Sequence, residues 1–164
     1  MLDIDEILEK HRDQKWGIYP YSVHLENVAQ FAEYFNNLYG KKEFDPIVVD
    51  LASYSHDSVE DTDVVPEELD ERIRDAVVLV SRNVSQGDLS YQEYIQMIAD
   101  SGNRLAILIK LSDALANYLL SEKNESSIIV RYQKSLPVLF KAYTNQEWDF
   151  NGDWRHDLSL LLPE

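Results

Sequence analysis

The segment that most constrains this chain is 47–63, where an apolar run leads directly into a group of charged side chains. His56 and Asp57 are adjacent, and Glu60 and Asp61 follow one helical turn later. A solvated helix end could carry the same charges, but polar groups at the end of a buried helix must be hydrogen-bonded or ligated. Because an imidazole and a carboxylate can bind one cation together, the segment predicts a metal-and-acid site.

Length and charge limit the classes of partner. The 164 residues and 45% hydrophobic content predict one globular domain, 1–164. Lys and Arg total 15 against 30 Asp and Glu, so nucleic acid and acidic membrane surfaces, which require a basic surface, are not expected as partners. A small anion remains possible where a metal or a few basic residues reverse the charge locally.

Three absences favour a cytoplasmic protein. The chain has no Cys, so it has neither disulfides nor thiolate ligands. Its first residues lack a basic region followed by an apolar stretch, and no apolar run is long enough to span a membrane. We therefore expect a soluble cytoplasmic protein, and the sequence does not predict its oligomeric state.

Apolar residues at helical spacing occur along most of the chain, and no segment shows convincing β-alternation, so we predict an all-α helical bundle. Asp45, Ser90 and Asn103 are the expected helix caps. The predicted helices are about 4–13, 22–39 with Gly40 as a left-handed stop, one from 45 into the charged segment, 66–83, 90–101, one from 103 and one after Asn124 that Pro137 kinks.

The remaining segments are a loop and a tail. Residues 84–88 are expected to form the loop between two helices. The core is expected to span about 16–143, and residues 144–164 are expected to form an aromatic tail that folds back on it. Trp148 and Trp154 in this tail could cover a pocket or be ordinary core residues.

Two further residues of ligand type lie on apolar helix faces, and each has a structural alternative. His24 could be a core histidine bonded to a carbonyl, or a ligand that points toward His56 and Asp57. Asp113 lies in an apolar stretch, where it is costly unless paired; it could form a surface ion pair with Lys110, three residues earlier. His11 could also be a ligand, although packing is the commoner role for such a residue.

Taken together, His24, His56, Asp57 and Asp113 would form a mixed nitrogen and oxygen shell. Such a shell suits Mn or other first-row ions and leaves coordination positions for water and substrate. The absence of Cys excludes a thiolate site.

Three motifs agree with this set. They are Pro20-Tyr21-Ser22-Val23-His24, His56-Asp57-Ser58-Val59-Glu60-Asp61-Thr62-Asp63 and Lys110-Leu111-Ser112-Asp113-Ala114-Leu115-Ala116-Asn117. They resemble the Pro-Tyr-x-x-His, His-Asp-x-x-Glu-Asp-Thr-Asp and Lys-Leu-Ala-Asp-x-x-x-Asn motifs of HD-superfamily metal-dependent phosphohydrolases, most closely the hydrolase domain of RelA/SpoT enzymes and the small alarmone hydrolases. Tyr91-Gln92-Glu93-Tyr94-Ile95 and Arg131-Tyr132 are similar to segments of small single-domain HD proteins.

The resemblance implies an HD-type bundle and a role for each matched residue. His24, His56, Asp57 and Asp113 would bind one divalent ion, expected to be Mn²⁺ with Fe, Co, Ni and Zn as alternatives. Glu60 and Asp61 would be the catalytic acids. The expected substrate-binding residues are Asn117, Lys15, Tyr21, Lys110 and Arg131. The reaction would be hydrolysis of the 3′-pyrophosphate of guanosine tetra- or pentaphosphate, a small anionic nucleotide.

Departures from the family pattern keep two other functions open. Ala114 stands where the family carries a basic residue after the last Asp ligand, and Leu25 replaces the usual Pro after the first His. Lys15 is the only candidate remaining from an Arg-Lys pair. The alternatives are an HD phosphohydrolase that acts on another nucleotide or phosphate ester, and a non-catalytic binding module that keeps the fold.

Overall fold

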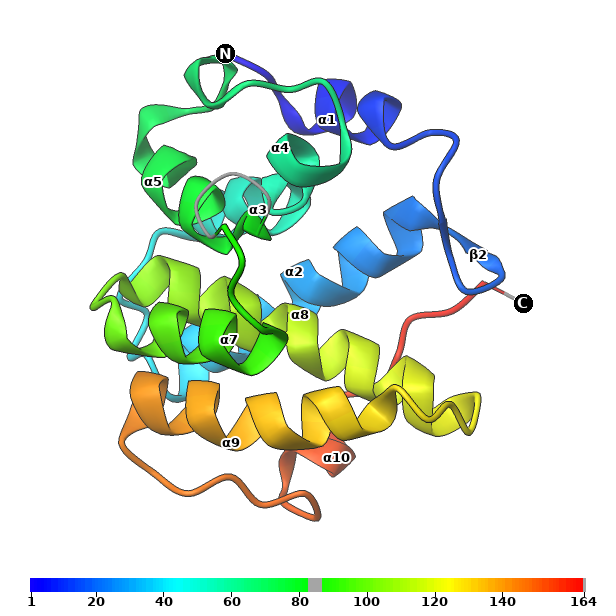
Figure 1. Cartoon of the computed structure of the whole chain (residues 1–164), viewed down its shortest axis with the longest axis vertical. Helices are drawn as coiled ribbons and strands as arrows, with labels where there is room; N and C mark the ends of the chain where they lie inside the picture. The colour runs from blue at the N-terminus through cyan, green and yellow to red at the C-terminus, as the bar shows by residue number, and fades with distance from the viewer. Residues whose placement is uncertain (83–86, 164) are drawn as a thin grey trace.

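The computed structural model describes residues 1–82 and 87–163, which are mostly helical (Figure 1). The prediction of a single-domain, all-α bundle is confirmed. The elements in chain order are α1 (Ile4–Lys10), β1 (Lys15–Trp16), β2 (Tyr19–Pro20), α2 (Tyr21–Leu38), α3 (Pro46–Ser55), α4 (Ser58–Asp61), the 3₁₀ turn η1 (Pro66–Glu68), α5 (Glu71–Val80), α7 (Tyr91–Asp100), α8 (Arg104–Lys123), α9 (Ile129–Thr144) and α10 (Trp154–Asp157).

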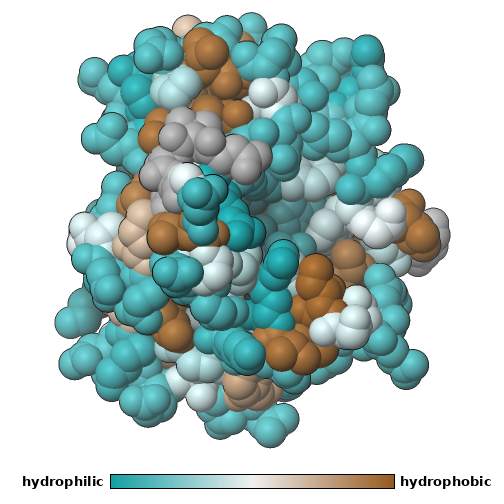
Figure 2. Space-filling model, viewed as in Figure 1, coloured by the Kyte–Doolittle hydropathy of each residue, from teal (hydrophilic) through white to brown (hydrophobic). Residues whose placement is uncertain are grey.

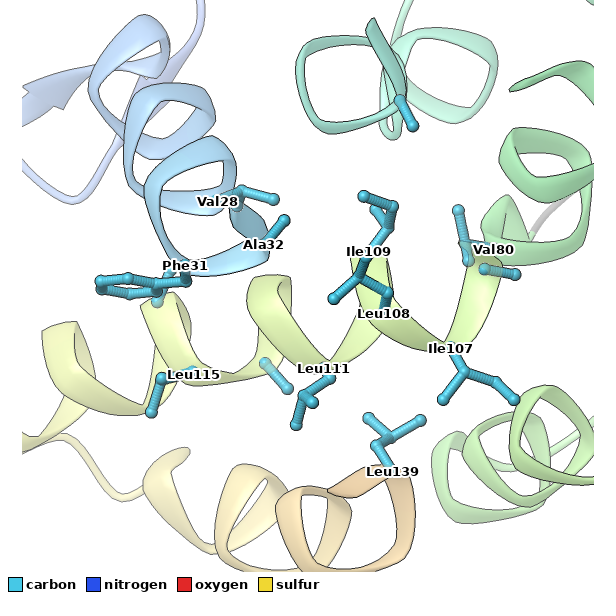
Figure 3. Packing of buried hydrophobic residues seen from close by; sticks show 14 of the residues in the cluster. Val28, Phe31, Ala32, Val80, Ile107, Leu108, Ile109, Leu111, Leu115 and Leu139 are labelled. Carbon is cyan, nitrogen blue, oxygen red and sulfur yellow. The ribbon is translucent and has the colours of Figure 1, made fainter. Parts of the chain in front are cut away.

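Helix α8 crosses the middle of the molecule and is buried around most of its circumference. Figure 3 shows Ile109 on the side of α2, and Leu111 and Ile107 on the opposite side, toward Leu139 of α9. A helix that is apolar all round requires partners on every side. Here α2, α3 and α5 contact α8 on one side, and α9 and α7 contact it on the other. Ser112 and Asp113, in the middle of α8, are therefore buried inside the bundle.

The predicted caps form as expected because capping depends on a few adjacent residues. Asp45 accepts a hydrogen bond from the Ile47 amide, and Asn103 accepts one from the Ala106 amide. Ser90 forms a capping box with Glu93. These caps begin α3, α8 and α7, which supply or surround most of the candidate site.

Three predicted helix boundaries are wrong. The first helix ends at Lys10 rather than near Asp13. The segment from Pro66 is a 3₁₀ turn, and α5 begins only at Glu71, because Asp70 provides the cap that Val65 cannot. Helix α5 ends at Val80 rather than near residue 83, because the backbone is extended at Ser81; residue 83 itself and the predicted loop at 84–86 lie outside the described residues.

The chain around Gly40 also differs from the prediction. The left-handed residues after α2 are Lys41 and Lys42 rather than Gly40. Gly40 is required for space instead, because a Cβ at this position would overlap the hydroxyl of Tyr143 on α9.

A further difference from the prediction is the hairpin of β1 and β2, in which Trp16 pairs with Tyr19.

Gly40→Ala is expected to lower the free energy of unfolding by about 1–3 kcal/mol through overpacking against Tyr143. The Tyr143 hydroxyl is buried and has no hydrogen-bond partner within the described part of the chain, so Tyr143→Phe alone should cost little. Urea denaturation of the two single variants and the double variant tests the contact. Gly40→Ala should cost less when Tyr143→Phe is also present; equal costs with and without Tyr143→Phe would exclude the Tyr143 hydroxyl as the cause.

The segment after α9 folds back on the bundle, as predicted. Trp148 and Trp154 stack with ring centroids 5.0 Å apart, and Trp154 belongs to the main core cluster. The chain then returns along α2, where the side-chain amide of Asn27 bonds both the amide and the carbonyl of Leu161. In Figure 1 this returning segment passes behind α8 and ends near β2. The tail residues are thus part of the bundle.

Within the two described ranges, no helix is both long enough and apolar enough to cross a membrane.

Candidate metal centre

His56 and Asp57 occupy the junction between α3 and α4, at the point where the apolar helix leaves the core. The His56 ring is 2% exposed, and its Nδ1 lies 2.7 Å from the backbone carbonyl oxygen of Ser53. A carbonyl can only accept, so this contact places a proton on Nδ1. Nε2, the ring nitrogen that remains for a ligand, points toward two carboxylates.

Helices α2 and α8 bring His24 and Asp113 to the same place. The Oδ1 atom of Asp113 lies 3.0 Å from His24 Nε2 and 3.4 Å from His56 Nε2. The Oδ2 atom of Asp57 lies 2.9 Å from His56 Nε2. One ligand atom from each of the four residues falls within 4.8 Å of the other three. The four predicted metal ligands therefore form one cluster, contributed by three segments of the chain.

Asp113 is held in the cluster by neighbours on its own helix. Lys110 Nζ lies 2.7 Å from Asp113 Oδ2, and the Asn117 side-chain amide donates to Oδ1 at 3.0 Å. Trp16 in turn donates through its ring Nε1–H to the side-chain oxygen Oδ1 of Asn117 at 2.9 Å. The Lys110–Asp113 pair considered from spacing exists, but it is buried rather than on the surface, with side chains 11% and 6% exposed.

Asp57 is held by a tyrosine from the start of α2. The Tyr21 hydroxyl donates to Asp57 Oδ2, the oxygen that faces the histidines. His11 stacks on the Tyr21 ring with centroids 5.0 Å apart, and its Nδ1 lies 2.8 Å from the Gln14 side-chain oxygen. His11 is thus packed beside the cluster and is not one of its four members.

The negative charges of the Asp57 and Asp113 carboxylates require a positive partner within the cluster. Burial alone would lower the pKa of His56, but Asp57 and Asp113 outweigh burial and raise it well above its usual value. Burial would raise the pKa of Asp113, yet Lys110 and the two histidines hold it well below its usual value. The carboxylates therefore stay ionised and need either protons on the imidazoles or a cation between them.

The cluster fits a divalent ion. His56 Nε2 is buried and has no hydrogen-bond partner within the described residues, although two carboxylates lie nearby. A buried nitrogen left without a hydrogen bond is costly unless something else binds it. Two imidazole nitrogens and two carboxylate oxygens form the donor set that first-row ions accept. A buried group that could bind metal is therefore present, while the identity of the metal is not determined by it.

Glu60 and Asp61 lie at the edge of the cluster on α4. Carboxylate oxygens of Asp57, Glu60 and Asp61 fall within 4.8 Å of one another. Asp61 is accessible to solvent, but partial desolvation, followed by the charges of Asp57 and Glu60, raises its pKa to about 6. A carboxyl group with this pKa can hold or release a proton near neutral pH.

The remaining predicted site residues are not joined to the four ligands. Among the described residues, no hydrogen bond or ion pair connects Lys15 or Arg131 to them; Lys15 is exposed on β1, and Arg131 packs over Tyr91. Figure 2 shows a hollow with mostly hydrophilic walls near the middle of one face, above the region where α2, α4 and α8 meet in Figure 1.

Sequence reasoning missed two supporting residues. Ser53 orients His56 through its carbonyl, and the spacing of three residues within one helix could have indicated this contact. Trp16 reaches Asn117 across 101 residues, and no local pattern predicts such a contact.

No protein-family model and no curated protein sequence matches this chain. The resemblance to HD phosphohydrolases therefore stays a prediction, carried by the three motifs and by the cluster that their residues form.

Proposed function

We propose that the protein is a metal-dependent phosphohydrolase of the HD type, with (p)ppGpp 3′-pyrophosphohydrolysis as the leading activity. The observation that carries the proposal is the convergence of His24, His56, Asp57 and Asp113 within 4.8 Å, next to two further carboxylates. A site that served only to stabilise the fold would not need Glu60 and Asp61 at its open edge. A small anionic nucleotide is the proposed ligand, and Mn²⁺ is the first metal to test.

The metal would supply Lewis acidity, since a bound divalent ion polarises a phosphoryl oxygen and acidifies water. The protein residues would position the reacting groups and move protons. Tyr21 fixes Asp57, while Lys110 and Asn117 fix Asp113, so two ligands are held before any ion binds. Asp61, with its raised pKa and accessible side chain, would take the proton from the attacking water or give one to the leaving group.

A second candidate is a phosphohydrolase of the same type that acts on a different nucleotide or phosphate ester. Ala114, at the position where the family carries a basic residue, has an exposure of 0%. This position therefore faces the core, and Lys15 makes no bond to the cluster within the described ranges. Recognition of a guanosine alarmone would therefore depend on basic side chains at positions other than those that the family uses.

The test is release of phosphate and pyrophosphate with added Mn²⁺ from a panel of substrates, compared between the native protein and Asp57→Ala. The panel contains guanosine tetraphosphate, nucleoside mono- and triphosphates and a generic phosphodiester. Pyrophosphate from the alarmone alone, lost in Asp57→Ala, supports the leading activity. Release from other compounds with the alarmone untouched supports the second candidate.

A matched control separates loss of the site from a general effect of removing a carboxylate. Asp75→Ala removes an exposed Asp of α5 that lies outside the cluster, and it should leave metal binding and turnover unchanged. Metal bound without any turnover would make the protein a binding module. A native protein that contains no metal, and that Mn²⁺ neither stabilises nor activates, would contradict the metal centre itself.

A further inference from the structure

Three cationic side chains from separate segments converge on the ring of Tyr91, the first residue of α7. Arg131 Cζ lies 4.3 Å from the ring centroid, Arg82 Cζ 5.7 Å and Lys110 Nζ 5.8 Å. Cations over an aromatic face at these distances are attracted by the ring quadrupole. Tyr91 thus holds together positive groups that would otherwise repel one another.

The two arginines of this group differ from the others in their partners. Four of the seven arginines, Arg12, Arg72, Arg104 and Arg155, form ion pairs with carboxylates. Arg74 donates to two backbone carbonyls. Within residues 1–82 and 87–163, no carboxylate pairs with Arg82 or Arg131.

Given the acidic composition of the chain, this lack of carboxylate partners is unexpected. The chain has 30 acidic residues against 15 basic ones, so a nearby acid is easily available to a surface arginine. Within the described ranges, Arg82 makes one side-chain hydrogen bond, to the Leu89 carbonyl, and Arg131 is exposed. A guanidinium group has five N–H donors in a fork that matches phosphate oxygens, so the donors that no described residue occupies can bind an anion.

The group adjoins the metal centre through Lys110. Its Nζ atom bonds Asp113 Oδ2 at 2.7 Å and also lies 5.2 Å from the ring centroid of Tyr94, one helical turn after Tyr91. Arg82 lies over the same Tyr94 ring, at 5.9 Å. Lys110 therefore links the metal centre to the cations around Tyr91, so the two groups are neighbours.

We propose that Arg82, Arg131 and Tyr91 form a subsite for a phosphate-class anion, separate from the metal ligands. Its occupant is a second phosphoryl group of the substrate, so the substrate class is small molecules that carry at least two phosphoryl groups. The assignment to a substrate rests on the proposed phosphohydrolase; the binding of the anion does not. Simple phosphate monoesters would lack the group that this subsite holds.

The test is isothermal titration of the full chain with inorganic pyrophosphate in the presence of a chelator, which removes binding through a metal. Arg131→Gln and Arg82→Gln are each expected to weaken pyrophosphate binding by about tenfold or more, and added salt should weaken binding to the native protein. Lys134→Gln is the matched control, because it removes an exposed charge one turn along α9 from Arg131, and it should change the affinity less than about twofold.

Failure of the subsite and failure of the proposed function give different results. In Asp57→Ala, pyrophosphate binding in chelator should persist within about twofold of native, even though metal binding and turnover are lost. Loss of that binding in Asp57→Ala would locate the anion at the metal cluster and overturn the subsite. Native affinity in both arginine variants, or no pyrophosphate binding by the native protein, would overturn it as well.

Discussion

Lys110→Met is expected to lower the free energy of unfolding of the metal-free protein by about 3–5 kcal/mol. The substitution keeps most of the side-chain volume but leaves the Asp113 carboxylate buried without its nearest cation, 2.7 Å away. Burial alone disfavours the charged forms of both Lys110 and Asp113. Asp113 and then Tyr91 raise the pKa of Lys110 well above its usual value, so this amine is charged in the folded protein.

Added Mn²⁺ should restore part of the stability lost in Lys110→Met, because an ion at the cluster would offset the charge of Asp113 in place of the amine. Thermal and urea unfolding with chelator and with Mn²⁺ measure both effects. The control is Lys141→Met, which breaks a pair with Glu147 whose side chains are 50% and 87% exposed; its cost should stay below about 1 kcal/mol. A Lys110→Met protein that is destabilised equally with and without Mn²⁺ would contradict an ion next to Asp113.

Asp61→Asn is expected to reduce turnover by about 10²–10⁴-fold while metal affinity stays within about twofold of native. Asp61 is not among the four ligands, but its carboxylate lies beside those of Asp57 and Glu60, and its pKa of about 6 allows proton transfer near neutral pH. Asn keeps the size of the side chain and cannot exchange a proton. Steady-state kinetics and metal titration of the same preparation separate the two quantities.

The control for Asp61→Asn is Asp63→Asn, two residues along the chain. Asp63 is exposed and pairs with Lys10 at 2.8 Å, so its loss should leave turnover within about twofold of native. Native turnover in Asp61→Asn would exclude this residue from proton transfer and leave Glu60 as the candidate acid. A large loss of metal affinity in Asp61→Asn would instead make Asp61 a ligand.

The parts of the fold that sequence reasoning predicted are those determined by neighbouring residues. The caps at Asp45, Ser90 and Asn103 each depend on a hydrogen bond to an amide two or three residues away, so they are visible in the sequence. The reason for Gly40 is not visible, because it depends on Tyr143, more than a hundred residues later. Pro66 predicts a helix start, although Asp70 provides the cap of α5.

In the candidate site, too, the sequence predicts what depends on neighbouring residues and does not predict the contacts between distant ones. Periodicity places His24 and Asp113 on apolar helix faces, and the motifs indicate that they are ligands. Neither periodicity nor the motifs predict the distances between the two side chains. The Tyr21–Asp57 bond and the buried Lys110–Asp113 pair follow from how α2, α3 and α8 pack. Arg82 carried no sequence signal, because its relation to Tyr91 arises only when α7 lies beside the end of α5.

The bonds between Asn27 and Leu161 have a consequence for the order of folding during synthesis. The amide of Asn27 is buried in the finished protein, and two of its hydrogen-bond partners are backbone groups 134 residues later in the chain. A ribosome makes α2 first, and early segments begin to fold before later ones emerge. The hydrogen bonds between Asn27 and Leu161 therefore cannot form until Leu161 has been synthesised. The native packing of the tail along α2 is thus among the last contacts that synthesis of the chain allows.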